Sequence, residues 1–262
     1  MSEQVQKPVP VLTFHKIDPS FEWGVTRVTP RQFRKIIHGL KSRGYTSIHL
    51  SQLCSSEYAL PEKPVIITFD DAYKSVFEHA VPVLDEFNFT ASIFVITGFV
   101  GKINTWDVNV GGLRFEHMNW QQIEDLHRSG FEIGSHTVHH PDLTRIGPEY
   151  IRQEVLESKH ELEQHLQDRV EFISLPFGRY TRSVIDICRA AGYSGVCTYW
   201  LKSGDYGSRF IIPRRAWYLF DPWFMLDIKC SNGLPGFVEM MKLRLINFFS
   251  HGTALIKPVL KK

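Results

Sequence analysis

Two short segments of this chain carry residue types that can bind a metal ion and move protons. The first, Thr68-Phe69-Asp70-Asp71, ends in two adjacent carboxylates. The second, Ser135-His136-Thr137-Val138-His139-His140-Pro141, places two imidazoles four residues apart, at His136 and His140. One carboxylate and two imidazoles can hold a divalent ion with a position left for water, and the second carboxylate can then act as a base. The two segments together therefore predict a metal-dependent hydrolytic site.

Each segment also has an ordinary structural interpretation when it is taken alone. An Asp-Asp pair after a strand is equally typical of one residue that caps the next helix and another that is solvated. The chain has 12 histidines, so a chance His-x-x-x-His pair is common. Both segments occur in this chain, and each follows an apolar run. This combination favours one site to which both segments contribute.

Short apolar runs alternate with helical patterns along the chain, which predicts a parallel sheet with helices outside it. Residues 100–118 lack a period and predict a long loop. The predicted strands cover residues 9–15, 47–50, 65–69, 91–96, 131–134, 172–175, 195–198 and 210–212. The predicted helices cover residues 30–42, 73–87, 148–166 and 181–191, and one more runs from a cap at Asn119 to near Gly130.

The residues that can do chemistry fall at the carboxyl ends of predicted strands. His15, the Asp70-Asp71 pair, the segment from His136 to His140 and the Pro176-Phe177 pair each follow one of them. In parallel barrels, active sites form at that edge. This coincidence predicts a barrel with one shared mouth.

The two segments resemble the first two motifs of the polysaccharide deacetylase family, also called the NodB-homology or carbohydrate esterase 4 family. The opening Pro10-Val11-Leu12-Thr13-Phe14-His15-Lys16-Ile17 and the later Leu175-Pro176-Phe177-Gly178-Arg179-Tyr180 resemble the branch with poly-N-acetylglucosamine deacetylases. The resemblance runs from about residue 9 to about residue 215. It implies an α/β fold, namely a distorted (β/α)7-type barrel of mostly parallel strands with outer helices. It also implies a divalent metal ion and removal of acetyl groups from N-acetylated sugars.

The resemblance implies a role for each residue of the two motifs. Asp71, His136 and His140 would bind one divalent ion, zinc by preference and cobalt or nickel as alternatives. Asp70 would be the general base. A register shift of one place would exchange His140 for His139, but the proline that follows His140 favours His140.

The remaining roles fall on a turn and on the first strand. By resemblance, the backbone N–H of Phe177, in the turn that Pro176 opens, would stabilise the oxyanion. The departing amine needs a general acid, and His15 is the candidate because the poly-N-acetylglucosamine branch has a histidine at the end of its first strand. The alternative for His15 is a strand-end histidine bonded to a loop. His251 does not match the Leu-x-His pattern of other family members.

One motif departs from the family pattern. Many members have an arginine in the third motif that pairs with the base, whereas this chain has Ile173-Ser174-Leu175-Pro176. Arg214 is the preferred substitute, and its neighbour Arg215 is the alternative. A bidentate arginine would keep the carboxylate ionised and oriented. The alternative for either arginine is an ordinary charged side chain on the surface.

Length, composition and charge indicate the domain organisation and the classes of partner to expect. A chain of 262 residues with 43% hydrophobic content can form a full core, and we expect a single domain over 1–262 with 219–262 as a C-terminal helical extension. A net charge of +2 and the lack of a basic tract argue against nucleic-acid binding. No apolar run predicts a transmembrane segment, and the polar first ten residues predict a cytoplasmic protein. Residues 237–249 could contact a membrane surface, but packing against the barrel is favoured.

The two motifs and the family resemblance together imply a metal-dependent carbohydrate de-N-acetylase, a hydrolase of linear amide bonds. Its substrate would be an N-acetylated polysaccharide or a glycan precursor, and a cytoplasmic location slightly favours the precursor. Two alternatives use the same site, on an O-acetyl ester or on a non-sugar amide. A third is a glycan-binding relative without activity, which the missing third-motif arginine suggests.

Overall fold

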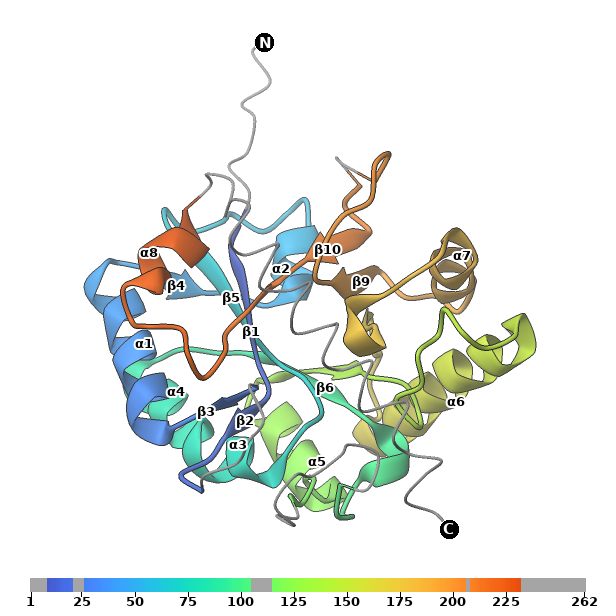
Figure 1. Cartoon of the computed structure of the whole chain (residues 1–262), viewed down its shortest axis with the longest axis horizontal. Coiled ribbons are helices and arrows are strands. Elements are labelled where there is room, and N and C mark those ends of the chain that lie inside the picture. The colour runs from blue at the N-terminus through green and yellow to red at the C-terminus, as the bar shows by residue number, and fades with distance from the viewer. Residues whose placement is uncertain (1–8, 21–25, 105–114, 206–207, 232–262) are drawn as a thin grey trace.

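The computed structural model describes residues 9–20, 26–104, 115–205 and 208–231. In this part of the chain, parallel strands form a sheet that is nearly closed into a barrel, with helices around it (Figure 1). The strands of the barrel are β1 (Val11–Phe14), β5 (Pro64–Phe69), β6 (Ser92–Val95), β7 (Glu132–Ser135), β8 (Phe172–Ser174), β9 (Gly195–Thr198), β10 (Ile211–Pro213) and β11 (Arg215–Ala216). Their order is β10-β9-β8-β7-β6-β5-β1-β11, which confirms the predicted α/β barrel.

Three short strands complete the sheets. β4 (Thr46–Ser47) pairs with β5 beside the barrel, in parallel. β2 (Lys16–Ile17) and β3 (Arg27–Val28) form a separate parallel pair. His15 is the single residue between β1 and β2, so it lies at the carboxyl end of the first barrel strand.

The segment that contains β10 and β11 brings the two edges of the sheet together. β10 pairs with β9 on one side, and β11 pairs with β1 on the other. Only Arg214 separates them, and its backbone N–H donates to the Thr198 carbonyl at 2.7 Å. Trp217 continues the segment by donating to the Thr13 carbonyl at 2.8 Å. If β10 and β11 are taken as one interrupted strand, the barrel has seven strand positions, with Arg214 fixed at the joint.

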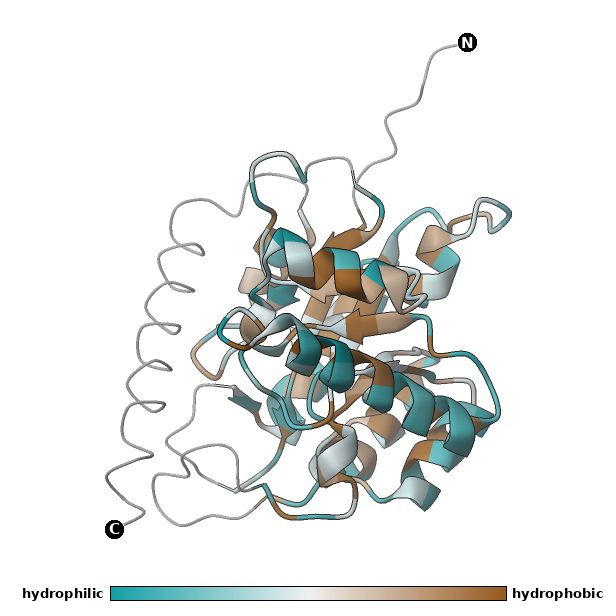
Figure 2. Ribbon diagram, turned by 90° about the vertical axis from the view of Figure 1, so that its right-hand side faces the viewer, coloured by the Kyte–Doolittle hydropathy of each residue, from teal (hydrophilic) through white to brown (hydrophobic). Residues whose placement is uncertain are grey.

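The helices cover the outside of the barrel, with their hydrophilic faces turned to solvent and the hydrophobic strands inside (Figure 2). Helices α1, α4 and α8 lie on one side in Figure 1, and α6 and α7 on the other. α1 begins at a capping box of Thr29 and Gln32 and buries an apolar stripe that includes Phe33 and Leu40. The helices are α1 (Pro30–Ser42), α2 (Leu50–Cys54), α3 (Lys74–His79), α4 (Val81–Phe87), α5 (Trp120–Arg128), α6 (Pro148–Leu166), α7 (Arg182–Ala190) and α8 (Met225–Cys230), with short 3-10 turns η1 (Thr97–Phe99) and η2 (Pro176–Gly178).

Two predicted elements were wrong in part. The helix expected over residues 73–87 is split at Ala80 into α3 and α4, because Pro82 lacks an N–H and its ring crowds the preceding turn. The strand expected over residues 47–50 ends at Ser47, and α2 begins at Leu50. The carboxylate of Glu132 accepts the N–H groups of Leu50 and Ser51, both at 3.0 Å, and this contact stabilises a helix start there.

Some expectations concern residues outside the described part. The segment 237–249 lies there, as does most of the loop predicted over residues 100–118. The division into one domain with a C-terminal extension therefore stays a prediction. Among the helices that the structure describes, none combines the length and the hydropathy needed to span a bilayer.

Candidate active site

Three buried side chains converge beyond the carboxyl ends of β5 and β7. Asp71 Oδ1 lies 3.5 Å from His136 Nε2 and 3.8 Å from His140 Nε2. One ligand atom from each residue lies within 4.8 Å of the others, so the set could hold a metal ion. A tetrahedral zinc ion at about 2.0–2.1 Å from its ligands separates them by about 3.4 Å. The spacing and the donor types therefore fit zinc or a similar ion.

Neighbouring groups orient His136 for this role. Its Nδ1 donates to the Ser174 carbonyl at the end of β8, at 2.7 Å, which leaves Nε2 directed at Asp71. Such a bond fixes the tautomer of a ligating histidine. Burial lowers the pKa of His136, and burial together with His136 lowers that of His140 further. Both rings are therefore neutral near pH 7, as metal binding requires.

The loop between β7 and α6 positions His140 and turns His139 away. Glu154 on α6 accepts the N–H groups of Val138 and His139, at 2.9 and 2.8 Å, and also Nδ1–H of His139. The His139 side chain is 66% exposed, whereas His140 is buried with the N–H of its backbone donating to Thr137 Oγ1. The structure thus brings His140, the preferred residue, into the cluster. Nothing in the sequence distinguishes Glu154 from the other acids of α6.

Asp70 is buried beside this cluster and is paired with Arg214. The two guanidinium nitrogens of Arg214 donate to the two carboxylate oxygens of Asp70, each at 2.8 Å. Arg214 also donates to Ser174 Oγ at 2.7 Å and to Thr68 Oγ1 at 3.2 Å. Burial alone would raise the pKa of Asp70, but Arg214, together with His136 and His15, outweighs it and holds that pKa well below its usual range. Arg215, the alternative partner, donates instead to backbone carbonyls near the end of α8.

His15, directly after β1, is half-buried and lies near Asp70, to which Tyr199 connects it. Burial lowers the pKa of His15 to about 4, with Arg214 and His136 adding to the effect and Asp70 opposing it. The Tyr199 hydroxyl lies 3.3 Å from His15 Nε2 and 3.3 Å from Asp70 Oδ2. Tyr199 was not predicted, although it directly follows β9 and the strand-end pattern that identified His15 applies to it as well.

The turn η2 closes the other side of the cluster. The Phe177 ring packs against His140, with 4.9 Å between ring centroids. Arg179 pairs with Asp142 at 2.8 Å, which ties the turn to the loop after His140. The turn that contains Pro176 and Phe177, both predicted site residues, therefore lies directly beside the possible metal ligands.

Backbone strain is concentrated in these same loops. Left-handed φ angles are uncommon for residues with a side chain, and strained residues gather at functional sites. Among the described residues that are not glycine, seven have a positive φ, and two of these, Asn88 and Gln167, are helix C-caps. The other five belong to the site loops: Asp71, Ala72, Thr137, His140 and Phe177, with φ of 70°, 48°, 68°, 57° and 60°.

Comparison with known sequences identifies the family. The sequence profile of the polysaccharide deacetylases matches residues 57–196, more than half of the chain. The chain belongs to the polysaccharide deacetylase family. Its membership supports a hydrolase, as predicted from the two motifs.

Curated members of the polysaccharide deacetylase family are similar over most of this chain. A Bacillus subtilis protein, YxkH, whose name assigns it to the polysaccharide deacetylases, is 27% identical over 201 residues, 74% of this chain and 67% of the relative. A Staphylococcus aureus poly-β-1,6-N-acetyl-D-glucosamine N-deacetylase is 23% identical over 176 residues. That match covers 63% of this chain and 58% of the relative.

Solved structures of deacetylases share the fold. IcaB from Ammonifex degensii is 25% identical, with a TM-score of 0.70 over 86% of this chain and 97% of that one. The Streptococcus pyogenes deacetylase PplD, solved with acetate, is 23% identical. Its TM-score is 0.72 over 85% of this chain and 98% of that one, and at this identity the likeness concerns the fold alone.

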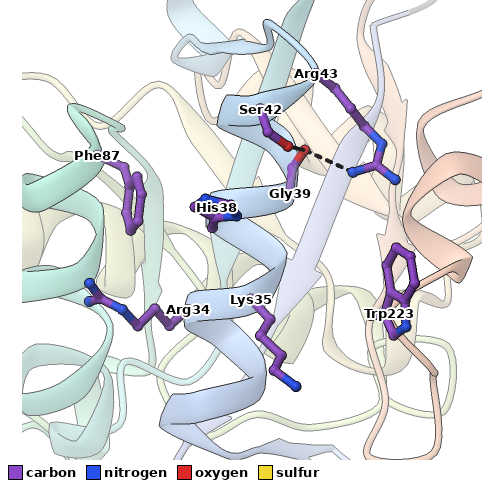
Figure 3. Close-up of a pocket in the computed structure, with 8 residues that line it drawn as sticks. All are labelled: Arg34, Lys35, His38, Gly39, Ser42, Arg43, Phe87 and Trp223. Carbon is purple, nitrogen blue, oxygen red and sulfur yellow. Dashed lines mark hydrogen bonds between the residues drawn. The ribbon is translucent and has the colours of Figure 1, made fainter.

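A separate hollow of about 510 Å³ lies along α1 (Figure 3). Phe87 and Trp223 line its two sides, and none of its lining residues belongs to the candidate active site. Its two arginines already have partners, since Arg34 pairs with Glu86 and Arg43 with Asp227. The charges of both arginines are therefore already balanced, and we assign no second site to the hollow.

Proposed function

We propose that this protein is a metal-dependent hydrolase that removes acetyl groups from N-acetylated sugars. One observation carries the proposal: a buried carboxylate, Asp70, is kept ionised by Arg214 directly beside Asp71, His136 and His140. A metal-binding cluster alone could be structural. A second, separately oriented carboxylate beside it is what a hydrolytic site requires.

The roles of the side chains follow from their positions. Asp71, His136 and His140 would hold one divalent ion, zinc by preference, with cobalt and nickel as alternatives. When bound, such an ion supplies the Lewis acidity that makes water a nucleophile near neutral pH. Asp70 accepts the proton that this water loses, and the bidentate contact with Arg214 keeps its oxygens in a fixed orientation.

Two further groups act on the amide. The backbone N–H of Phe177 would donate to the oxyanion that forms when water attacks, since the turn from Pro176 lies against His140. His15 would protonate the departing amine, which leaves poorly as an anion. The pKa of His15, about 4, means that it is neutral before the reaction and must acquire this proton.

The substrate proposed is an N-acetylglucosamine polymer or a precursor of one. It is supported by the name of the Staphylococcus aureus relative, which acts on poly-β-1,6-N-acetyl-D-glucosamine. The pairing of Arg214 with Asp70 weakens the alternative of an inactive glycan-binding protein, because that alternative rested on the missing third-motif arginine. The cytoplasmic location and the precursor substrate stay predictions.

The test is acetate release from N-acetylglucosamine oligomers, measured with metal content before and after chelation. We expect release that chelation abolishes and that Zn²⁺, Co²⁺ or Ni²⁺ restores, and we expect His136→Ala to lose both metal and activity. Lys102→Ala, at an exposed position outside the cluster, is the matched control. Release that chelation leaves unchanged contradicts the metal role. Release from aryl or O-acetyl esters without release from the oligomers would favour the esterase instead.

A further inference from the structure

We propose that the Tyr199 hydroxyl relays a proton from Asp70 to His15, so that the proton taken from water reaches the amine. This inference rests on the proposed function, in which Asp70 is the base and His15 the acid. It adds a residue that the two motifs do not contain and that connects their two proton-carrying groups.

The geometry places one hydroxyl between the two groups. Tyr199 Oη lies 3.3 Å from Asp70 Oδ2 and 3.3 Å from His15 Nε2. Among the hydrogen bonds of the described residues, none joins Asp70 directly to His15. The shortest connection between base and acid that the structure describes therefore passes through Tyr199.

The surroundings hold the Tyr199 ring in this place. Gly178 lies against it so closely that a Cβ there would come within 2.4 Å of the ring. The guanidinium carbon of Arg214 lies 5.4 Å from the Tyr199 ring centroid, within the range of a cation–π contact. The same arginine thus orients both the carboxylate and the ring that carries the hydroxyl.

The protonation states suit a relay. Burial, followed by the nearby Asp70 carboxylate, raises the pKa of Tyr199 well above its usual value, so the residue keeps its O–H throughout the neutral range. His15 is neutral there because burial lowers its pKa, and in the Nδ1–H tautomer its Nε2 can accept a proton. The hydroxyl has a single proton, which it donates to ionised Asp70 at rest and can donate to His15 once Asp70 is protonated.

The transfer balances as follows. The water oxygen bonds to the acetyl carbon while one water proton moves to Asp70 Oδ2. Asp70 then gives a proton to Tyr199 Oη as Tyr199 gives its own to His15 Nε2, which restores the carboxylate and the phenol. The His15 imidazolium gives a proton to the amide nitrogen as the C–N bond breaks, and the second water proton leaves with the acetic acid.

The test compares two leaving groups in Tyr199→Phe. An amine must be protonated to depart, whereas 4-nitrophenolate departs without a proton. We expect Tyr199→Phe to lower kcat on N-acetylglucosamine oligomers by about 10²-fold, the scale of general acid catalysis, and to leave kcat on 4-nitrophenyl acetate unchanged. The matched control is Tyr193→Phe, an equally conservative change at a buried tyrosine that donates to the Val155 carbonyl of α6. That control should keep activity on both substrates.

A second variant shows whether Tyr199 acts through His15. His15→Ala should give the same substrate-selective loss, and the double variant His15→Ala/Tyr199→Phe should be no worse than His15→Ala alone. The relay is overturned if Tyr199→Phe keeps wild-type activity on oligomers, if it loses both substrates equally, or if the two losses multiply. Failure of the proposed function is a different result, since the wild-type protein would then release no acetate that depends on metal.

Discussion

The two ends of the barrel differ in how many residues with side chains take a left-handed backbone angle. At the amino ends of the strands, Gly44, Gly130 and Gly192 have φ of 77°, 90° and 82°, and a Cβ added to any of them would meet nothing within 4 Å. Glycine adopts such angles without strain. At the carboxyl ends, residues with side chains take the same angles at a cost of about 1–2 kcal/mol each: Asp71, Ala72, Thr137, His140 and Phe177. Among the described residues with side chains, the amino ends have only the helix C-caps Asn88 and Gln167 at such angles. Most of this strain therefore lies at the end where the side chains form the candidate active site.

The two ends also differ in what one carboxylate at each end contacts. Glu132, at the start of β7, accepts the backbone N–H groups of Leu50 and Ser51 and the Ser92 hydroxyl. These neutral donors fasten α2 to the barrel. Asp70, at the other end, is paired with a buried cation and lies beside the possible metal ligands. Glu132 therefore contributes to stability, and Asp70 is placed to accept a proton.

The largest expected effect distinguishes these two carboxylates. Asp70→Asn should lower kcat on acetylated oligomers by about 10²–10⁴-fold, because the amide cannot accept the proton. Glu132→Gln should leave kcat of the folded protein unchanged but lower the free energy of unfolding by about 1–3 kcal/mol, since one N–H loses its acceptor. Steady-state kinetics and urea unfolding measure the two effects.

Asp70→Asn also leaves Arg214 buried without its counter-charge, so this variant loses stability as well. Its activity should therefore be measured where it is fully folded and should be expressed per bound metal ion. Wild-type activity under those conditions contradicts the assignment of Asp70 as base. A loss of activity in folded Glu132→Gln contradicts the division between the two ends.

A smaller effect concerns acid stability and His117, a buried histidine near the carboxyl ends. Its Nδ1 bonds to the Asp71 carbonyl at 2.7 Å, and burial lowers its pKa to about 4. Unfolded protein takes up this proton below the ordinary histidine pKa of about 6.5, while folded protein does so only near 4. The group thus destabilises the fold as the pH falls from 6.5 to 4, by about 3 kcal/mol in total, and has no effect above that window.

His117→Gln should remove this part of the acid sensitivity. Unfolding free energies of the chelated protein at pH 7, 6, 5 and 4 measure it, with wild type and variant compared at each pH. The two curves should differ in slope between pH 6.5 and 4 and run parallel above it. Curves that stay parallel to pH 4 show that His117 takes up its proton equally in both states.

Local signals in the sequence predicted much of the fold. The bounds of α1 and α6 agree with their predictions because proline at the first helical position marks each start. The same reading of prolines could have located the break at Ala80, since Pro82 lies within the expected helix. The strand-end pattern also predicted that Asp70, Asp71, His136 and His140 lie at one edge of the sheet.

Residues that act through distant contacts were harder to predict. Whether Arg214 or its neighbour reaches Asp70 depends on how β10 and β11 join the two edges of the sheet, and this closure leaves no local signal. Ser174 lies in the third motif, yet its contact with Arg214 depends on the same closure. Glu154 binds the loop before His140 from a helix whose other acids look identical in sequence.

The smallest expected effect measures the strain itself. Gly130→Ala adds a methyl group in open space at φ +90°, so the change should lower the free energy of unfolding by about 1–2 kcal/mol through backbone strain alone. Gly147→Ala adds the same group in open space at φ −72°, where no left-handed strain arises, and should change stability by less than about 1 kcal/mol. Neither should change kcat on the oligomers.

Equal losses of unfolding free energy in the two variants mean that left-handed angles are not costly in this barrel, and the angles at Asp71 and His140 are then no sign of a functional site. A drop in kcat with Gly130→Ala instead shows that the glycine end transmits its conformation through β7 to His136.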